Sequence, residues 1–166
     1  FGLERARRHG IPAVTVPRRQ YPDDHAFNAD LWKEIAVFQP DLVVLAGFMS
    51  LLHLPPEYTL RVVNVHPALI PAFCGKGMYG HHVHEAVLAY GAKISGATVH
   101  FVDEQYDHGP IIIQRACPVL DDDTPDTLAE RVQAVEREIY PVAIRWIAEG
   151  RVQVEGRRVR ILGGTE

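Results

Sequence analysis

The sequence predicts an α/β protein whose central sheet is mostly parallel, with an antiparallel edge and helices on both faces. Segments with the apolar pattern of strands alternate with segments of helical spacing, which is typical of parallel sheets. The continuous apolar run 42–46 indicates a strand that is covered on both faces. Strand candidates 97–102 and 111–119 are joined through the turn at Gly109-Pro110, and this short connection indicates an antiparallel pair.

Apolar periodicity and breaker residues place the other elements along the chain. In the first half we expect a helix over 1–9 closed by Gly10, a strand over 13–16, a helix over 24–38 capped by Asp23 or Asp24 and ended by Pro40, a helical turn over 55–60 and a strand from Arg61. In the second half we expect a helix over 81–90, a helix over 125–149 capped by Thr124 and closed by Gly150, and a terminal hairpin around Glu155-Gly156.

Composition and charge narrow the class of protein. With 166 residues, one domain is expected, and 47% hydrophobic with 23% charged residues is ordinary for a soluble protein. A net charge of -4 argues against a general binder of nucleic acid or anionic membranes. No apolar run approaches the roughly 20 residues of a membrane span, and no signal peptide is visible. Cys74 and Cys117 lie far apart without CxxC spacing, so we expect free thiols in a cytoplasmic protein.

The stretch 61–71 is the most informative one for chemistry. It begins as a buried strand and breaks at Pro67 and Pro71. Asn64 and His66 are two residues apart, so an extended chain projects both from one face, at the strand end where open α/β sheets place ligands. Two interpretations stay open: a reactive pair, or an amide and an imidazole that satisfy loop backbone groups.

Asp107, in the loop before Gly109-Pro110, is the candidate partner of this pair. If Asp107 reaches His66 with Asn64 beside them, Asn64 would stabilise an oxyanion while His66 and Asp107 manage protons. A nearby carboxylate favours the imidazolium, so we expect a positively charged His66. No serine or cysteine lies on a recognisable nucleophile elbow, which points to direct attack by a substrate amine. Loop aspartates before glycine also cap turns, so that alternative stays open.

Two further motifs have plain alternatives. Gly75, Gly77 and Gly80 match the G-x-G-x-x-G fingerprint of dinucleotide sites, but nine residues containing two prolines separate the first glycine from the strand. A flexible loop over a ligand is therefore favoured. The histidines within 81–84 could chelate a metal from one helix face, yet no second ligand cluster supports them, so a solvated helix start is favoured.

Four segments carry a family resemblance: Asn64 to Phe73, Gly96 to Glu104, Asp107 to Ile112, and Glu136 to Pro141. They are similar to phosphoribosylglycinamide formyltransferases, the folate-dependent transformylases of purine synthesis, and the resemblance extends from about Leu3 to Leu162. The Asn-x-His-Pro segment and the distant Asp-x-Gly are shared by several formyltransferases. The Val-His-Phe strand and the 136–141 segment favour this member.

The resemblance implies a single formyltransferase domain over 1–166 with a Rossmann-like fold. The domain would be incomplete at its N-terminus, without the first strand and the loop that cradles the substrate phosphate. The implied reaction transfers the formyl group of 10-formyltetrahydrofolate to the amine of glycinamide ribonucleotide in purine (IMP) biosynthesis. No metal, nucleic acid or membrane is implied, and the protein would be a monomer or homodimer. Formyltetrahydrofolate hydrolase and a folate-binding remnant without turnover remain the alternatives.

The resemblance also implies roles for individual residues. Asn64, His66 and Asp107 match the catalytic triad of the family, and the Ile70-Pro71 peptide bond is expected to be cis. Gln133 and Glu136, three apart on one helix, would reach the ribonucleotide. Where the family often has an arginine near the folate tail, this chain reads Asp23-Asp24-His25. The implied folate pocket is lined by Met49, Ser50, Leu51, Leu52, Asn64, Asp103, Glu104, Gln105, Tyr106 and Asp107.

Overall fold

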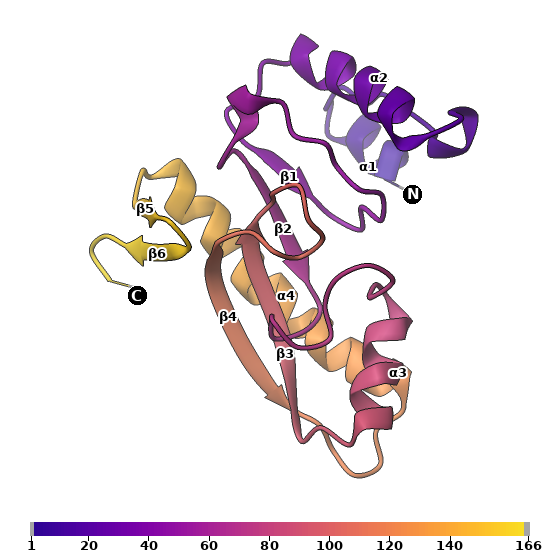
Figure 1. Ribbon diagram of the computed structural model, residues 1–166, viewed down its shortest axis with the longest axis vertical. Coiled ribbons are helices and arrows are strands. Elements are labelled where there is room, and N and C mark those ends of the chain that lie inside the picture. The colour runs from indigo at the N-terminus through magenta and orange to yellow at the C-terminus, as the bar shows by residue number, and fades with distance from the viewer. Residues whose placement is uncertain (1, 165–166) are drawn as a thin grey trace. The chain divides into compact units, whose positions relative to one another are not determined.

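The computed structural model describes residues 2–164, which form two compact units that divide between Asp41 and Leu42 (Figure 1). The first unit contains helix α1 (Gly2–Arg8), the short 3-10 helix η1 (Arg18–Gln20) and helix α2 (Asp24–Val37). Asp23 caps α2, since its carboxylate accepts a hydrogen bond of 2.8 Å from the backbone N–H of Ala26. Both helices predicted for this unit are confirmed.

The strand predicted over residues 13–16 is wrong. This segment is neither helix nor strand in the structure, and Val14 is exposed. Val14, Thr15 and Val16 have strand propensity, but a strand needs a neighbour for its backbone hydrogen bonds. No strand is formed elsewhere in the described part of this unit, so the propensity has nothing to pair with.

The second unit is built on a four-stranded mixed sheet, which confirms the α/β class. Its strands, in spatial order, are β1 (Val43–Leu45), β2 (Val62–His66), β3 (Ile94–Phe101) and β4 (Ile111–Pro118), and the 3-10 helix η2 (Pro56–Tyr58) connects the first two. The pair β1 and β2 is parallel, whereas β2 with β3 and β3 with β4 are antiparallel. The antiparallel part is therefore larger than the edge that the sequence predicted.

Helix α3 (His81–Tyr90) lies in the connection between β2 and β3, which run in opposite directions. The pairing of His66 with Thr98 leaves residues 94–97 beyond the end of β2, so β3 enters the sheet from that end.

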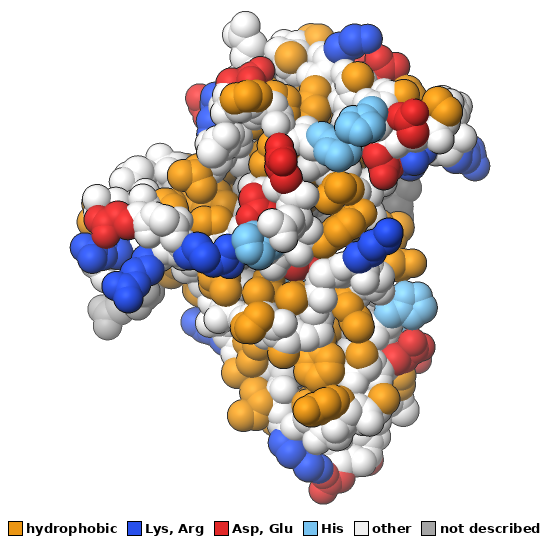
Figure 2. Space-filling model, in the orientation of Figure 1, with side chains coloured by type: hydrophobic (Ala, Val, Ile, Leu, Met, Phe, Trp, Pro, Cys, Tyr) orange, Lys and Arg blue, Asp and Glu red, His pale blue; other side chains and the backbone are white. Residues whose placement is uncertain are grey.

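Helix α4 (Pro125–Ala148) packs on β3 and β4 and against α3. It begins with a capping box in which the Thr124 side chain accepts from the backbone of Thr127, as the sequence predicted for its start. Its inner face buries Leu128, Val132 and Trp146 against strand residues such as Val99. On the face drawn in Figure 2, hydrophobic side chains gather over α3, β3 and β4.

The chain ends in the predicted hairpin, with β5 (Val152–Glu155) and β6 (Arg158–Ile161) forming a separate two-stranded sheet. Its turn contains Gly156, whose φ of +59° suits glycine. Arg157, beside that glycine, donates a hydrogen bond of 2.6 Å to the carbonyl oxygen of His108. The hairpin thus contacts the loop between β3 and β4. Among the described residues, no helix is long and apolar enough to cross a membrane.

Candidate active site

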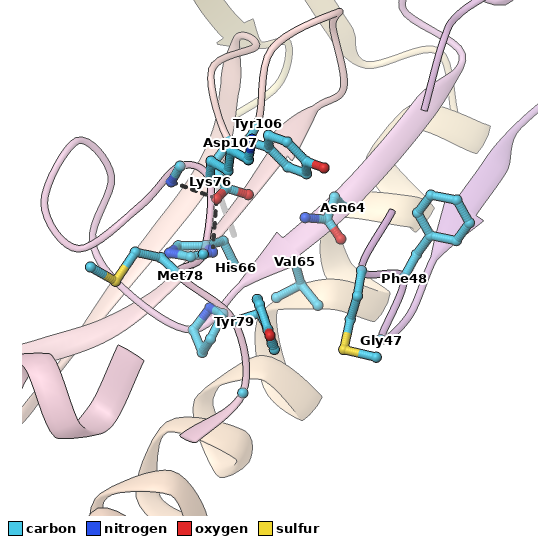
Figure 3. Close-up of a pocket in the computed structure, with 15 residues that line it drawn as sticks. Gly47, Phe48, Asn64, Val65, His66, Lys76, Met78, Tyr79, Tyr106 and Asp107 are labelled. Carbon is cyan, nitrogen blue, oxygen red and sulfur yellow. Dashed lines mark hydrogen bonds and ion pairs between the residues drawn. The ribbon is translucent and has the colours of Figure 1, made fainter. Parts of the chain in front are cut away.

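Asn64, His66 and Asp107 meet at the end of β2 (Figure 3). His66 Nδ1 lies 3.4 Å from Asp107 Oδ2, and the two side chains are only 3% and 10% exposed. Asn64 and His66 project toward the same cavity, as the spacing of two along an extended strand predicted. The structure thus brings together the three residues that the sequence singled out.

The loop between β3 and β4 is shaped to deliver Asp107 to this place. Asp107 has a φ of +53°, a left-handed conformation that aspartate tolerates better than most residues. Gly109 follows where a Cβ atom would lie 1.9 Å from the carbonyl oxygen of Phe101. Only glycine allows this close approach, so the Asp-x-Gly motif needs glycine at position 109. The backbone N–H of Gly75 then donates a hydrogen bond of 2.9 Å to Asp107 Oδ2.

His100 is a fourth member of the cluster, which the sequence analysis did not assign to the site. A register shift between Val99 and His100 in the pairing of β3 with β4 sets its position. His100 Nδ1 donates to the carbonyl oxygen of Phe101 at 2.7 Å, so Nε2 faces the site. Nε2 lies 3.5 Å from Asn64 Nδ2 and 3.7 Å from Asp107 Oδ1. The pairing of His100 with Asn64 across β2 and β3 was the one signal for this role, and it required knowing the register.

Burial and neighbouring groups have opposing effects on the pKa values of Asp107 and His66. Burial alone would raise the pKa of Asp107, but His100, His66 and the Gly75 amide outweigh it and hold that pKa below its ordinary value. Burial lowers the pKa of His66, and Asp107 and the Phe73 carbonyl oppose this shift without cancelling it. The pKa of His66 thus lies below the ordinary imidazole value, because the desolvation cost exceeds the attraction of the carboxylate, and the positive charge expected on His66 stays a prediction.

Both ring nitrogens of His66 nevertheless face oxygen acceptors. Nδ1 faces Asp107, and Nε2 lies 2.8 Å from the carbonyl oxygen of Phe73. A neutral imidazole carries one N–H, so it can donate to only one of these oxygens at a time. A second proton would find an acceptor already in place. The geometry thus prepares His66 to accept a proton during a reaction.

Two adjoining cavities surround this cluster. The larger, about 430 Å³, is lined by the triad together with Met49 and the loop 75–80. The smaller, about 50 Å³, shares Asn64, Tyr106 and Asp107 with it and contains four further residues of the implied folate pocket: Ser50, Leu51, Leu52 and Asp103. Glu104 and Gln105 belong to the same loop but line neither cavity. The implied pocket is thus divided between two connected spaces.

Gln133 and Glu136 stand apart from these cavities, on α4. Gln133 is exposed, and its side-chain oxygen accepts a hydrogen bond of 3.2 Å from Arg137. Glu136 is partly buried, and burial raises the pKa of its carboxyl group above the ordinary value. Within the described residues, Glu136 makes no hydrogen bond or ion pair. The structure leaves the implied contact with a ribonucleotide untested.

The glycine-rich loop lines the larger cavity. Gly75, Gly77 and Gly80 have φ values of +94°, +88° and +53°, and Lys76 lies between the first two. Lys76 is the single lysine or arginine that lines this cavity in the described chain. The sequence favoured a loop over a ligand here, and its place beside the triad supports that interpretation rather than a dinucleotide fingerprint.

The remaining candidates lie elsewhere. Of the histidines within 81–84, His81 faces Asp126 at 3.5 Å, His82 faces Glu85 at 3.3 Å, and His84 is buried. No group of three or more potential metal ligands occurs in the part of the chain that is described. Cys74 and Cys117 are free thiols, as predicted. The Ile70-Pro71 peptide bond is cis, as the resemblance implied.

Comparison with known proteins shows the family of this chain. Residues 1–144 match the family model described as formyl transferase. The chain is 42% identical over 155 residues to a chloroplastic phosphoribosylglycinamide formyltransferase of Arabidopsis thaliana, covering 92% of this chain and 53% of the relative. It is 40% identical over 156 residues to the phosphoribosylglycinamide formyltransferase of Escherichia coli, covering 93% and 71%. The chain thus spans about half the length of the plant relative.

Solved structures give the same answer for the fold. Glycinamide ribonucleotide transformylase 1 from Symbiobacterium toebii superposes with a TM-score of 0.88 at 47% identity, covering 98% of this chain and 75% of that one. A formyltetrahydrofolate deformylase from Pseudomonas syringae superposes with a TM-score of 0.84 at 29% identity, covering 96% and 52%. The formyltransferase fold expected from the sequence is confirmed. The chain therefore belongs to the formyl transferase family, alongside the phosphoribosylglycinamide formyltransferases.

Proposed function

We propose that this chain carries the site that transfers the formyl group of 10-formyltetrahydrofolate to the amine of glycinamide ribonucleotide in de novo purine synthesis. The observation that carries the proposal is the convergence of Asn64, His66 and Asp107 at one cavity. These residues come from two segments about 40 positions apart, and the chain is 40% identical to an enzyme named for this activity. Asn64, His66 and Asp107 are the proposed catalytic residues.

The proposed reaction begins when the substrate amine attacks the formyl carbon, so that a C–N bond forms and the formyl oxygen becomes an oxyanion. The Asn64 side-chain amide donates to that oxyanion. The proton that the amine loses passes to the pair of Asp107 and His66, in which the Asp107 carboxylate stabilises the imidazolium. The bond from the carbon to N10 of the folate then breaks, and N10 receives the proton from His66.

The two cavities suggest how the substrates are arranged. The folate would lie beside Leu52, Asp103 and Tyr106, with its formyl carbon toward Asn64, and would need more room than the roughly 50 Å³ of the smaller cavity alone. The ribonucleotide amine would occupy the larger cavity, where Lys76 offers a positive charge to the substrate phosphate. Gln133 and Glu136 would bind ribose hydroxyl groups, since the Glu136 carboxylate has unused acceptor capacity.

A hydrolase, in which water replaces the amine, is the second candidate. The fold similarity to a formyltetrahydrofolate deformylase favours keeping it, although the identity is lower than for the transformylases. The deciding assay supplies 10-formyltetrahydrofolate to the purified full-length protein, with and without glycinamide ribonucleotide. Donor consumption that depends on the amine and matches formylated product supports the transferase. Equal consumption without the amine identifies a hydrolase, and donor binding without turnover identifies a remnant.

We base two further proposals, the cellular compartment and the oligomeric state, on the same family relationship. We propose a cytoplasmic protein that acts as a monomer or homodimer on small molecules, without a nucleic acid partner. Cell fractionation and sedimentation of the full-length protein test these two points separately. A protein recovered with membranes, or in an assembly larger than a dimer, would contradict them.

A further inference from the structure

The hydroxyl group of Tyr140, on α4, lies between the two parallel strands that lead into the site. Its Oη atom is 2.7 Å from the carbonyl oxygen of Leu45 on β1 and 3.0 Å from that of Val63 on β2. Carbonyl oxygens only accept, so the Tyr140 hydroxyl is the donor and shares its one proton between them. Burial raises the pKa of Tyr140, so the hydroxyl remains protonated across the working pH range.

The two acceptors are placed where the strands give way to catalytic residues. Leu45 is the last residue of β1, and Gly47 and Met49 follow it at the wall of the larger cavity. Val63 directly precedes Asn64 on β2. Leu45 also pairs with Asn64 in the parallel register. A bond to both carbonyls therefore fixes the end of β1 relative to the residue of β2 that precedes Asn64.

Tyr140 also lies close to Glu136 on helix α4. Tyr140 lies four residues after Glu136, so the two side chains occupy the same face of α4, one turn apart. Pro141 follows within the helix and has no N–H to offer the carbonyl of Arg137. The helix is thus weakened at this turn, and an outside anchor there has more influence on where Glu136 lies.

We propose that Tyr140 is a positioning residue for formyl transfer, which holds the Glu136 face of α4 in register with the strand ends that carry Asn64 and His66. The proposal rests on the proposed function, because it assigns the acceptor substrate to both elements at once. The sequence had marked 136–141 only as a family signature. In this proposal, Tyr140 sets the distance between the residues that contact the ribonucleotide and the place of the reacting amine.

The test is Tyr140→Phe in the full-length protein, since phenylalanine keeps the ring and removes only the donor. We expect kcat/KM for glycinamide ribonucleotide to fall about tenfold, because small misplacements of a reacting group are costly. Leu45 also lines the smaller cavity, so the Kd of the folate donor should change as well, but by less than kcat/KM for glycinamide ribonucleotide. Tyr90→Phe is the matched control: its hydroxyl belongs to a side chain that is 82% exposed, and its rates should equal those of the parent.

A double-mutant cycle with Glu136→Gln separates positioning from general destabilisation. If Tyr140 acts through the placement of Glu136, the effect of Tyr140→Phe should shrink severalfold in the Glu136→Gln background. Additive effects, parental kcat/KM, or an equal loss of donor affinity would overturn the proposal. An inactive parent protein would instead overturn the proposed function, so the two failures are distinguishable.

A direct measurement covers the case in which Tyr140→Phe folds poorly. A fluorinated tyrosine at position 140 keeps the ring and hydroxyl but loses its proton at lower pH. Because fluorine makes the hydroxyl a stronger donor, we expect a changed kcat/KM for glycinamide ribonucleotide together with a change in the carbonyl carbon shifts of Leu45 and Val63. Unmoved activity despite the changed carbonyl shifts would contradict a positioning role.

Discussion

Two carboxylates of this molecule, Asp107 in the loop after β3 and Glu136 on α4, are treated in opposite ways by their surroundings. Asp107 is almost fully buried yet has three neighbours, His66, His100 and the Gly75 amide, and its pKa is lowered. Glu136 is only partly buried, makes no hydrogen bond or ion pair in the described chain, and has a raised pKa.

The contrast teaches that partners, rather than burial alone, decide what a carboxylate can do. A group held by three neighbours is already organised for electrostatic stabilisation before any ligand arrives. A group with unused acceptor capacity is suited to bind hydroxyl groups that a ligand would bring. We therefore expect Asp107 to act mainly on the rate of the reaction and Glu136 mainly on substrate affinity.

Asp107→Asn should have the largest effect. The amide keeps the size of the side chain but removes the charge that stabilises a protonated His66, so kcat should fall about 10²- to 10⁴-fold. Donor affinity should change little, because the same atoms still fill the loop. Steady-state kinetics with donor binding by fluorescence measure both quantities. Asp122→Asn, an exposed aspartate away from both cavities, is the control, and equal loss of kcat and donor affinity would contradict the separation.

Asn64→Ala should come next, with kcat lowered about 10²- to 10³-fold, the range for loss of one oxyanion donor. The amide faces the shared wall of the two cavities, and its loss also removes the contact with His100. Single-turnover rates measure the chemical step directly. Because the role is electrostatic, Asn64→Asp should be no better than alanine. A rescue by aspartate would contradict the oxyanion assignment.

The fold could be predicted well wherever residues carry local signals. Asp23 and Thr124 marked helix starts, Gly10 and Gly150 marked ends, and the apolar runs marked strands. Strand direction was harder, since the order of strand, helix and strand suggested a parallel crossover. The short α3 and the loop before it reverse that direction, and their path depends on packing that periodicity does not encode. The isolated segment 13–16 failed for the same reason, because pairing is a tertiary property.

The site shows the same division. The alternation of side chains along a strand predicted that Asn64 and His66 share a face. The Asp-x-Gly motif pointed to Asp107. His100 depended on the cross-strand register, and Lys76 depended on where a glycine-rich loop folds back. For His66, a sequence shows the carboxylate partner but not the depth of burial that lowers its pKa. Spacing reports direction along one strand, whereas desolvation depends on every element packed around the group.

Glu136→Gln should affect binding and stability in opposite directions. The KM for glycinamide ribonucleotide should rise about tenfold to a hundredfold, as for a lost hydrogen bond to a charged group, while kcat changes less. Glu130→Gln, an exposed position on the same helix, is the matched control. A KM equal to that of the control would contradict the assignment of Glu136 to the substrate.

The stability effect of this variant follows from the sign of the pKa shift. The folded state holds the proton of Glu136 more tightly than the unfolded chain, because its pKa is raised. The native protein therefore loses stability as pH rises from the ordinary glutamate range through that raised pKa. Glutamine removes this loss, so the unfolding free energy of Glu136→Gln relative to the parent should increase between pH 4 and pH 7. Urea unfolding at both pH values measures the difference, and no change would contradict a raised pKa.

Lys76→Ala should give the smallest effect, because the ammonium group is exposed and solvent screens it. We expect KM for the ribonucleotide to rise up to about fivefold, with kcat and donor affinity unchanged. The effect should shrink at high salt, since the proposed contact with the phosphate is an exposed charge pair. Lys93→Ala is the control, because that lysine pairs with Asp121 at 2.7 Å outside the catalytic cavity. If Lys76→Ala raised KM equally at low and high salt, the lysine would act through the shape of the glycine-rich loop rather than through its charge.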